Sequence, residues 1–234
     1  MKSLIIIPAR FNSTRFPGKP LIDLKGKTMI QRVWESCKKS NATEVLVATD
    51  NDKIYNEVLK FGKVVMTSED CNSGTERVIE ASLNFSEYDI IINVQGDEPF
   101  IDHNDINKLI KSIQKNPKYI HTFITKLSRS EFRDRNVVKC IVKDKKIVMF
   151  TRSSIYDNFD NIFKHIGIYG FSKKIIKKIS NLKIKTENEL NENLEQLRWM
   201  DNDFEMYSLY TPKHSIGIDV PNDYKNALNF LNKI

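Results

Sequence analysis

The chain has 234 residues, of which 40% are hydrophobic and 29% are charged, the balance of a soluble globular protein. It carries 37 Lys and Arg against 30 Asp and Glu, and this formal net charge of +7 suits an anionic partner: a phosphorylated substrate, a membrane surface or a nucleic acid. No apolar run approaches the roughly 18 residues that a membrane helix needs. No block of about five or six like charges indicates a nucleic-acid tail.

The sequence also shows no pattern typical of a secretory signal peptide. The apolar run Leu4–Ile7 is too short for the core of a signal peptide, and Pro8 ends it. Cys37, Cys71 and Cys140 are odd in number and widely spaced, so they form neither a disulfide framework nor a zinc pattern. We expect reduced thiols and a cytoplasmic protein.

Strand and helix patterns alternate along the first half of the chain. In chain order we expect a strand at Leu4–Ile7, a helix at Thr28–Lys39, a strand at Val45–Ala48, a helix at Asp52–Phe61, a strand at Val64–Met66, a helix at Gly74–Leu83, a strand at Ile90–Val94 and a helix at Asp105–Gln114. Such alternation predicts a parallel sheet covered on both sides.

The second half begins rich in strand patterns and ends in helices. We expect strands at Tyr119–Leu127, Val137–Val142, Ile147–Arg152 and Ile166–Phe171, a helix at Lys173–Ile179, a long helix at Glu187–Met200, a strand at Met206–Leu209 and a helix at Asn222–Leu231. Lys143-Asp144-Lys145 is expected to turn between two of the strands. The prediction is a single domain over residues 1–234: an α/β, Rossmann-like three-layer sandwich with a mostly parallel sheet and a β-rich insert at about 119–171.

Three cations follow the first strand, in the loop from Pro8 to Pro20. Arg10, Arg15 and Lys19 lie beside Gly18 at a strand end, where open parallel sheets bind ligands. Together they can neutralise a triphosphate, whereas a single one would read as a solvated surface charge. The loop matches neither a Walker P-loop nor G-x-G-x-x-G, which disfavours an ATPase and an NAD enzyme.

Two further segments carry chemistry in their local pattern. Asp97 follows the apolar strand Ile90–Val94 and can hold Mg²⁺, or it can cap the next helix. Ser73 and Arg77 flank a helix start, where they can contact a base or ribose; Ser73 can equally be an N-cap.

These segments together resemble the 3-deoxy-manno-octulosonate (Kdo) cytidylyltransferases. The resemblance covers nearly the whole chain in order, through Ile6–Lys19, Ser73–Arg77, Asn93–Pro99, Phe150–Arg152, His165–Gly170, Leu194–Arg198 and Gly217–Asp219. It implies the nucleotide-diphospho-sugar transferase type of fold, with Kdo attacking the α-phosphate of CTP and pyrophosphate leaving. It further implies a homodimer built through the β-rich half and a role in lipopolysaccharide or capsule synthesis.

The resemblance also assigns residues to roles. It implies that Arg10, Lys19 and Asp97 are catalytic, that Asp97 and Asp219 bind Mg²⁺, and that Ser13, Arg15, Ser73, Arg77 and Gln95 bind substrate. Asp219, before Val-Pro-Asn, would by itself be read as a turn residue. The role of Glu98 stays open.

The sugar is expected to contact the β-rich half. Arg152 can pair with the sugar carboxylate through two parallel hydrogen bonds. His165 and Tyr169 lie four apart, so they share one face of a strand; His103, His121 and His214 are expected to be structural. The resemblance implies that Glu195 and Gln196 bind sugar hydroxyls, whereas an ordinary helix at Glu187–Met200 would bury Leu190, Leu194 and Leu197 and solvate its polar face.

Two departures from the family pattern concern the sugar. Tyr156 stands where members usually carry Pro, and Asn191 stands where they usually carry an apolar residue. The alternatives are therefore 8-amino-Kdo or another acidic sugar, such as a nonulosonic acid. Only the positive charge suggests a nucleotide- or nucleic-acid-binding protein without catalysis. A glycosyltransferase is another alternative, but its usual Asp-x-Asp metal motif does not follow Val94 in this chain.

Overall fold

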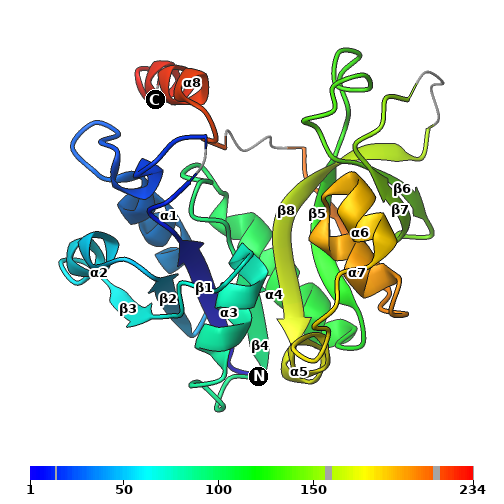
Figure 1. Ribbon diagram of the computed structural model, residues 1–234, viewed down its shortest axis with the longest axis horizontal. Helices are drawn as coiled ribbons and strands as arrows, with labels where there is room; N and C mark the ends of the chain where they lie inside the picture. The colour runs from blue at the N-terminus through cyan, green and yellow to red at the C-terminus, as the bar shows by residue number, and fades with distance from the viewer. Residues whose placement is uncertain (14, 156–159, 213–216, 234) are drawn as a thin grey trace. The chain divides into compact units, whose positions relative to one another are not determined.

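The computed structural model describes residues 1–13, 15–155, 160–212 and 217–233 (Figure 1). The chain divides into two compact units, the first made of Met1–Ile110 and Ser215–Ile234, the second of Lys111–His214. The sequence predicted one domain with a β-rich portion at about 119–171. The second unit extends beyond that portion because helices and a further strand pack with it. Within the described ranges, no helix is long and apolar enough to cross a bilayer.

The first unit is built on the predicted parallel sheet. Its strands lie in the order β3-β2-β1-β4, and every pair is parallel: β1 (Ser3–Ala9), β2 (Glu44–Thr49), β3 (Lys63–Met66) and β4 (Ile90–Asn93). All seven residues of β1 are buried, as expected for a strand covered on both faces. The carboxyl ends of β1 and β4 lead directly into the Arg10–Lys19 and Gln95–Pro99 segments.

The α-helices of the first unit follow the predicted spans within a few residues, whereas a short 3₁₀ helix was not predicted. These helices are the 3₁₀ helix η1 (Lys19–Leu21), α1 (Met29–Lys38), α2 (Asp52–Val58), α3 (Gly74–Ser82), α4 (His103–Lys115), which continues into the second unit, and α8 (Pro221–Leu231). Leu24, Met29, Ile218 and Ala227 are fully buried in one apolar cluster. This cluster holds the segment before α8 against residues that follow the first loop, and so positions Asp219.

The second unit closes five strands into a ring. They are β5 (Ile120–Thr125), β6 (Lys139–Lys143), β7 (Lys146–Thr151), β8 (Ile162–Ser172) and β9 (Met206–Tyr210). Pairing runs β8-β5-β9-β7-β6 and returns from β6 to β8; only β5–β9 is parallel. The α/β class is confirmed, but the sheet is mixed and not mostly parallel: β5–β8, β6–β7, β6–β8 and β7–β9 are all antiparallel.

The β6–β7 hairpin turns where predicted. Asp144 and Lys145 have φ of 50° and 65°, and two successive positive φ values give the turn whose twist matches that of a hairpin.

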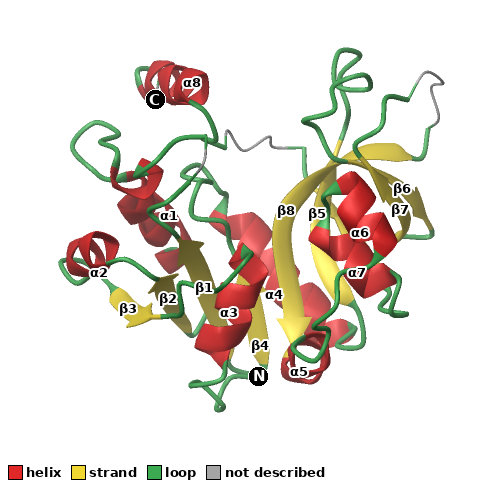
Figure 2. Cartoon of the chain, viewed as in Figure 1, coloured by secondary structure: helices red, strands yellow, loops and turns green. Residues whose placement is uncertain are grey.

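The predicted long helix Glu187–Met200 was wrong: two short helices, α6 (Glu187–Glu192) and α7 (Glu195–Met200), replace it (Figure 2). Asn193 adopts the left-handed conformation with φ of 52°, which Asn tolerates better than most residues, and Leu194 is extended. Leu190 is consequently 62% exposed, although a continuous helix would bury it. The preceding α5 (Lys173–Ile179) matches its prediction.

Candidate active site

The loop after β1 is closed by its own backbone. The N–H groups of Ser13 and Gly18 donate to the carbonyl of Phe11 at 2.9 and 2.8 Å, and Gly18 has φ of 71°, which favours glycine. Ser13 is buried, Arg10 is exposed, and Thr14 lies outside the described residues. The closure delivers Lys19 to the start of η1.

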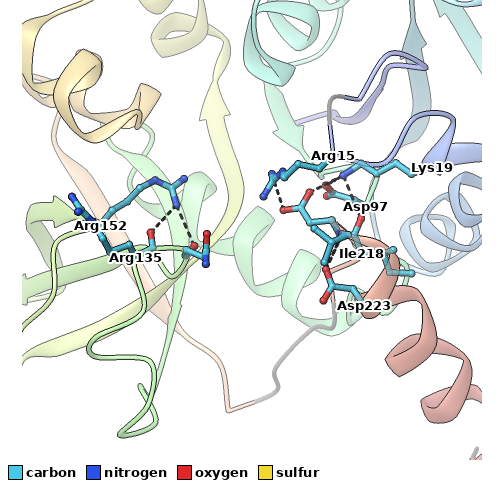
Figure 3. A network of polar contacts seen from close by, with 10 residues as sticks. Arg15, Lys19, Asp97, Arg135, Arg152, Ile218 and Asp223 are labelled. Atoms are coloured by element: carbon cyan, nitrogen blue, oxygen red, sulfur yellow. Dashed lines mark hydrogen bonds and ion pairs between the residues drawn. The ribbon is translucent and has the colours of Figure 1, made fainter.

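Lys19 is the centre of a charged cluster (Figure 3). Its Nζ lies 2.6 Å from Asp97 Oδ2 and 2.8 Å from Asp219 Oδ1, and it also donates to the carbonyl of Ile218 at 3.3 Å. Its side chain is only 12% exposed. Three residues that the sequence placed far apart, Lys19, Asp97 and Asp219, are therefore brought together.

The two carboxylates are held by their backbones. A Cβ on Gly96 would lie 2.7 Å from the carbonyl oxygen of Pro8, so only glycine lets the β4 end approach β1. The N–H of Ile218 donates to the carbonyl of Asp97 at 2.9 Å. Asp223 Oδ2 accepts from the N–H groups of Asp219 and Val220, each at 3.0 Å, which fixes Asp219 at the start of α8.

Opposite charges favour the ionised forms of Lys19 and Asp219. Burial by itself would lower the pKa of Lys19, but Asp97 and Asp219 outweigh it and the pKa is raised. Burial would likewise raise the pKa of Asp219, yet Lys19 and Arg15 lower it. Arg15 Nη2 lies 3.1 Å from Asp219 Oδ2, but its side chain is 62% exposed, so water screens this pair.

The cluster has the donor set for Mg²⁺. Within the described residues no group of three or more His, Cys, Asp or Glu side chains could hold a metal ion. Mg²⁺, however, is commonly bound through one or two carboxylates with phosphate oxygens and water. Asp97 and Asp219 already direct oxygens at one cation, the Lys19 ammonium, so the residues present fit such an ion.

Ser73 and Arg77 both have structural contacts. Ser73 accepts from the N–H of Glu76 at 3.1 Å, which confirms it as the N-cap of α3. Arg77 is 2% exposed; its guanidinium pairs with Asp50 at 2.5 Å and donates to Thr67 Oγ1 at 2.5 Å. We therefore interpret Arg77 as positioning α3 against the ends of β2 and β3, while direct contact of either residue with substrate stays a prediction.

Asp50 was missed by the sequence analysis. The signal that could have found it is its place one residue after β2, the same kind of strand end that drew attention to Asp97.

A polar chain leads from α3 to Gln95. Asn93 Nδ2 donates to Thr75 Oγ1 at 3.1 Å, and Gln95 Nε2 donates to Asn93 Oδ1 at 3.1 Å. A Cβ on Gly74 would come within 3.2 Å of Gln95 Oε1. The Gln95 amide is thus oriented by neighbours, as a residue that selects a ligand group needs to be.

In the second unit, Arg152 follows β7 and is held by Glu192. The N–H of Arg152 donates to Glu192 Oε2 at 2.6 Å, and Glu192 Oε1 accepts from Thr151 Oγ1 at 2.7 Å. The guanidinium Nη1 donates to the carbonyls of Asn136 at 3.1 Å and Arg135 at 3.5 Å (Figure 3). Glu192 therefore serves the Arg152 backbone and does not lie on a continuous helix face with Glu195.

His165 and Tyr169 share a face of β8, as predicted. Their ring centroids lie 5.5 Å apart, and Tyr169 packs edge-on against Trp199 at 5.0 Å. Burial lowers the pKa of His165 to about 3, so its imidazole is neutral. Thr122 Oγ1 lies 2.8 Å from His165 Nε2.

Gln196, at the start of α7, is 3% exposed, and the half-buried Glu195 precedes it. The residues predicted to contact the sugar all belong to the second unit, and their contact with a sugar stays a prediction.

Other histidines have varied places. His121 is buried, with Nδ1 3.0 Å from Ser112 Oγ and Nε2 2.9 Å from the carbonyl of Asn116, which confirms a structural role. His103 Nδ1 lies 3.7 Å from Asp102. His214 and Tyr156 lie outside the described residues.

Known proteins resemble this chain along its whole length. Residues 4–208 match the family model described as Cytidylyltransferase. A 3-deoxy-manno-octulosonate cytidylyltransferase of Fusobacterium nucleatum is 40% identical, covering 99% of this chain and 97% of its own. One from Cytophaga hutchinsonii is 42% identical over 93% of each chain.

A solved structure agrees with these relatives. The structure of a CMP:2-keto-3-deoxy-manno-octonic acid synthetase complexed with CTP matches with a TM-score of 0.94 and 33% identity, covering 100% of this chain and 99% of the other. The loop, the carboxylate pair and the two-unit fold thus occur in a chain that belongs to the cytidylyltransferase family, among the 3-deoxy-manno-octulosonate cytidylyltransferases.

Proposed function

We propose that this enzyme transfers CMP from CTP to the anomeric hydroxyl of Kdo and releases pyrophosphate. The observation that supports the proposal is the cluster of Lys19, Asp97 and Asp219. The chain's relatives are named 3-deoxy-manno-octulosonate cytidylyltransferases. In the reaction, the sugar oxygen forms a bond to the α-phosphorus, the bond from that phosphorus to the bridging oxygen of pyrophosphate breaks, and the hydroxyl proton passes to water.

The first unit would supply positioning and charge. Arg10, Arg15 and Lys19 would neutralise the triphosphate and the departing pyrophosphate, while Ser13 and the α3 start at Ser73 would offer further donors. Asp97 and Asp219 would hold Mg²⁺, which when bound supplies positive charge to the α-phosphate and the attacking hydroxyl. No protein base is required in this scheme, because the reaction depends chiefly on alignment.

The second unit would bind the sugar. Arg152 would pair with its carboxylate, and Glu195 and Gln196 would bind hydroxyls. Thr122 Oγ1 donates to the carbonyls of Ile166 or Ile168, at 3.1 and 2.8 Å, so it accepts from His165 Nε2–H. The neutral His165 then offers Nδ1 as an acceptor for a sugar hydroxyl.

The test is pyrophosphate release from CTP and Kdo, with ATP, GTP and UTP as controls. Release only with CTP supports the proposal, and no release with any nucleotide refutes it. A parallel series with 8-amino-Kdo and nonulosonic acids tests the alternative sugars. These are considered because Asn191, an exposed residue next to Glu192, departs from the family pattern.

We also propose a cytoplasmic homodimer that supplies lipopolysaccharide or capsule synthesis. Its support is the exposure of Val148 (51%) and Met149 (45%) on β7, where a second copy could cover them. Light scattering should give twice the chain mass, and a monomer would refute the dimer. Salt-dependent DNA binding without pyrophosphate release would instead favour a nucleic-acid-binding protein.

A further inference from the structure

The Lys19 ammonium occupies a built cation site. An ammonium has three N–H donors, and three protein oxygens lie within reach of them: Asp97 Oδ2 at 2.6 Å, Asp219 Oδ1 at 2.8 Å and the Ile218 carbonyl at 3.3 Å. The oxygens come from two segments fixed by Gly96 and Asp223. Three oxygens thus surround one positive charge, and the Lys19 side chain is only 12% exposed.

A divalent ion cannot bind these oxygens while the Lys19 ammonium occupies them. Mg²⁺ bound to both carboxylates would stand about 2.0–2.1 Å from their oxygens. The ammonium is hydrogen-bonded to the same two carboxylates, and two cations a few ångströms apart repel each other even at partly exposed carboxylates such as Asp97 (27% exposed) and Asp219 (45% exposed). Binding of the metal to both carboxylates therefore requires Lys19 to leave.

The loop offers Lys19 an alternative set of partners. It ends the Arg10–Lys19 segment that is proposed to cradle the triphosphate, so phosphate oxygens would replace Asp97 and Asp219 as its partners. We propose that Lys19 holds the place of the divalent ion in the nucleotide-free enzyme and vacates it only when the triphosphate arrives. This inference rests on the proposed function for the identity of the nucleotide.

Two consequences follow from this exchange. The free enzyme binds metal weakly, and the two negative charges of Asp97 and Asp219 are offset by Lys19 and by the more exposed Arg15 before the triphosphate arrives. Because coupling between two ligands is reciprocal, the nucleotide also strengthens metal binding. Arg15 does not compete in the same way, because it pairs with the other oxygen of Asp219 and is largely exposed.

The experiment titrates Mn²⁺ into the nucleotide-free protein and follows free Mn²⁺ by electron paramagnetic resonance. We expect Lys19→Met to bind Mn²⁺ at least about tenfold more tightly than wild type. Lys19→Arg keeps the positive charge and should stay within about threefold, as should Arg15→Gln. Adding Asp97→Asn to Lys19→Met should abolish the gain, which places the ion at these carboxylates.

Equal or weaker Mn²⁺ binding by Lys19→Met would overturn the proposal. Circular dichroism checks the fold, and Lys19→Gln, which keeps a hydrogen-bond donor without the charge, replaces Lys19→Met if the latter does not fold. The readout needs no turnover, so a failure here is distinct from failure of the pyrophosphate assay, which would refute the proposed reaction.

Discussion

Asp97 is the single residue whose charge we expect turnover to need most, because it follows β4 and accepts the 2.6 Å hydrogen bond of Lys19. Asp97→Asn keeps the shape but removes the anion, so kcat should fall about 100- to 1000-fold while the fold survives. Pyrophosphate release at saturating Mg²⁺, with circular dichroism, measures both. The exposed Asp70→Asn is the matched control. Wild-type turnover in Asp97→Asn would remove it from the site.

Arg152 should matter for the sugar alone. A charge-assisted hydrogen bond is worth about 1.5–3 kcal/mol, so Arg152→Ala should lower kcat/KM for Kdo roughly 10- to 150-fold and leave that for CTP nearly unchanged. Arg152→Lys should recover only part, because an ammonium cannot make two parallel bonds. Steady-state kinetics with each substrate varied decides. Arg129→Ala, an exposed arginine of the same unit, is the control; equal losses in both would refute a specific role.

At this scale the sequence predicts some positions and not others. Asp97 and Lys19 were predictable as residues of this sheet edge, because each comes after a buried strand at the edge where parallel sheets bind ligands; their catalytic roles stay predictions. Arg77 was not predictable in this way, because its partners Asp50 and Thr67 come from other strand ends, and only the folded sheet brings them within 2.5 Å. The spacing of residues along one element does not reveal a contact between elements.

Among elements, the break between α6 and α7 sets the start of the predicted sugar-binding helix. Asn193 is left-handed there, so Asn193→Gly should change stability by less than about 0.5 kcal/mol, whereas the β-branched Asn193→Val should cost about 1–2 kcal/mol. Urea unfolding followed by Trp199 fluorescence in a Trp34→Phe background measures this, since these are the two tryptophans. Equal stability of the two variants would show that the break tolerates any residue.

The connection between β5 and β6 is tied to β8 by Glu131 and Lys164, whose charged atoms lie 2.7 Å apart. Burial alone would raise the pKa of Glu131, but Lys164 and Ser128 hold it at about 2. A lowered carboxyl pKa stabilises the fold fully above the ordinary value of about 4.5, and this contribution is lost as pH falls towards about 2. Glu131→Gln should therefore cost about 2 kcal/mol at pH 6 and clearly less at pH 3.5.

Urea midpoints of wild type and Glu131→Gln at both pH values check this. Lys60→Gln, at an exposed ion pair in the first unit, is the control and should cost little at either pH. A Glu131→Gln difference that does not shrink on acidification would contradict the ion-pair explanation.

The elements themselves were largely predictable. Apolar runs such as Ile90–Asn93 indicate their own strands, because burial on both faces leaves no polar position. The closure of the second unit could not be predicted, because it depends on parallel pairing of β5 with β9, which are separated by a long segment of the chain. The helix break was also hidden, because Asn193 is compatible with a helix until tertiary contacts favour the alternative.

For the whole molecule, the net charge of +7 should assist capture of a polyanion. Raising salt from about 0.02 to about 0.3 M shortens the screening length several-fold, so we expect KM for CTP to rise roughly three- to tenfold. KM for the sugar, which has one carboxylate, should rise much less. Kinetics at the two salt concentrations with Mg²⁺ fixed provide the test, and a salt-independent KM for CTP would refute steering by charge.

The hydrogen bond from Lys19 to Asp219 joins positions 200 apart in sequence, with the entire second unit between Asp97 and Asp219. On the ribosome, residues 111–214 are made before Asp219 emerges, so the first unit lacks its last segment, Ser215–Ile234, while the second unit can already fold. Any chain broken off earlier lacks one of the two carboxylates and the Ile218 contact that seats it. A fragment that ends before Asp219 therefore cannot assemble the Lys19, Asp97 and Asp219 cluster, and we expect it to release no pyrophosphate from CTP.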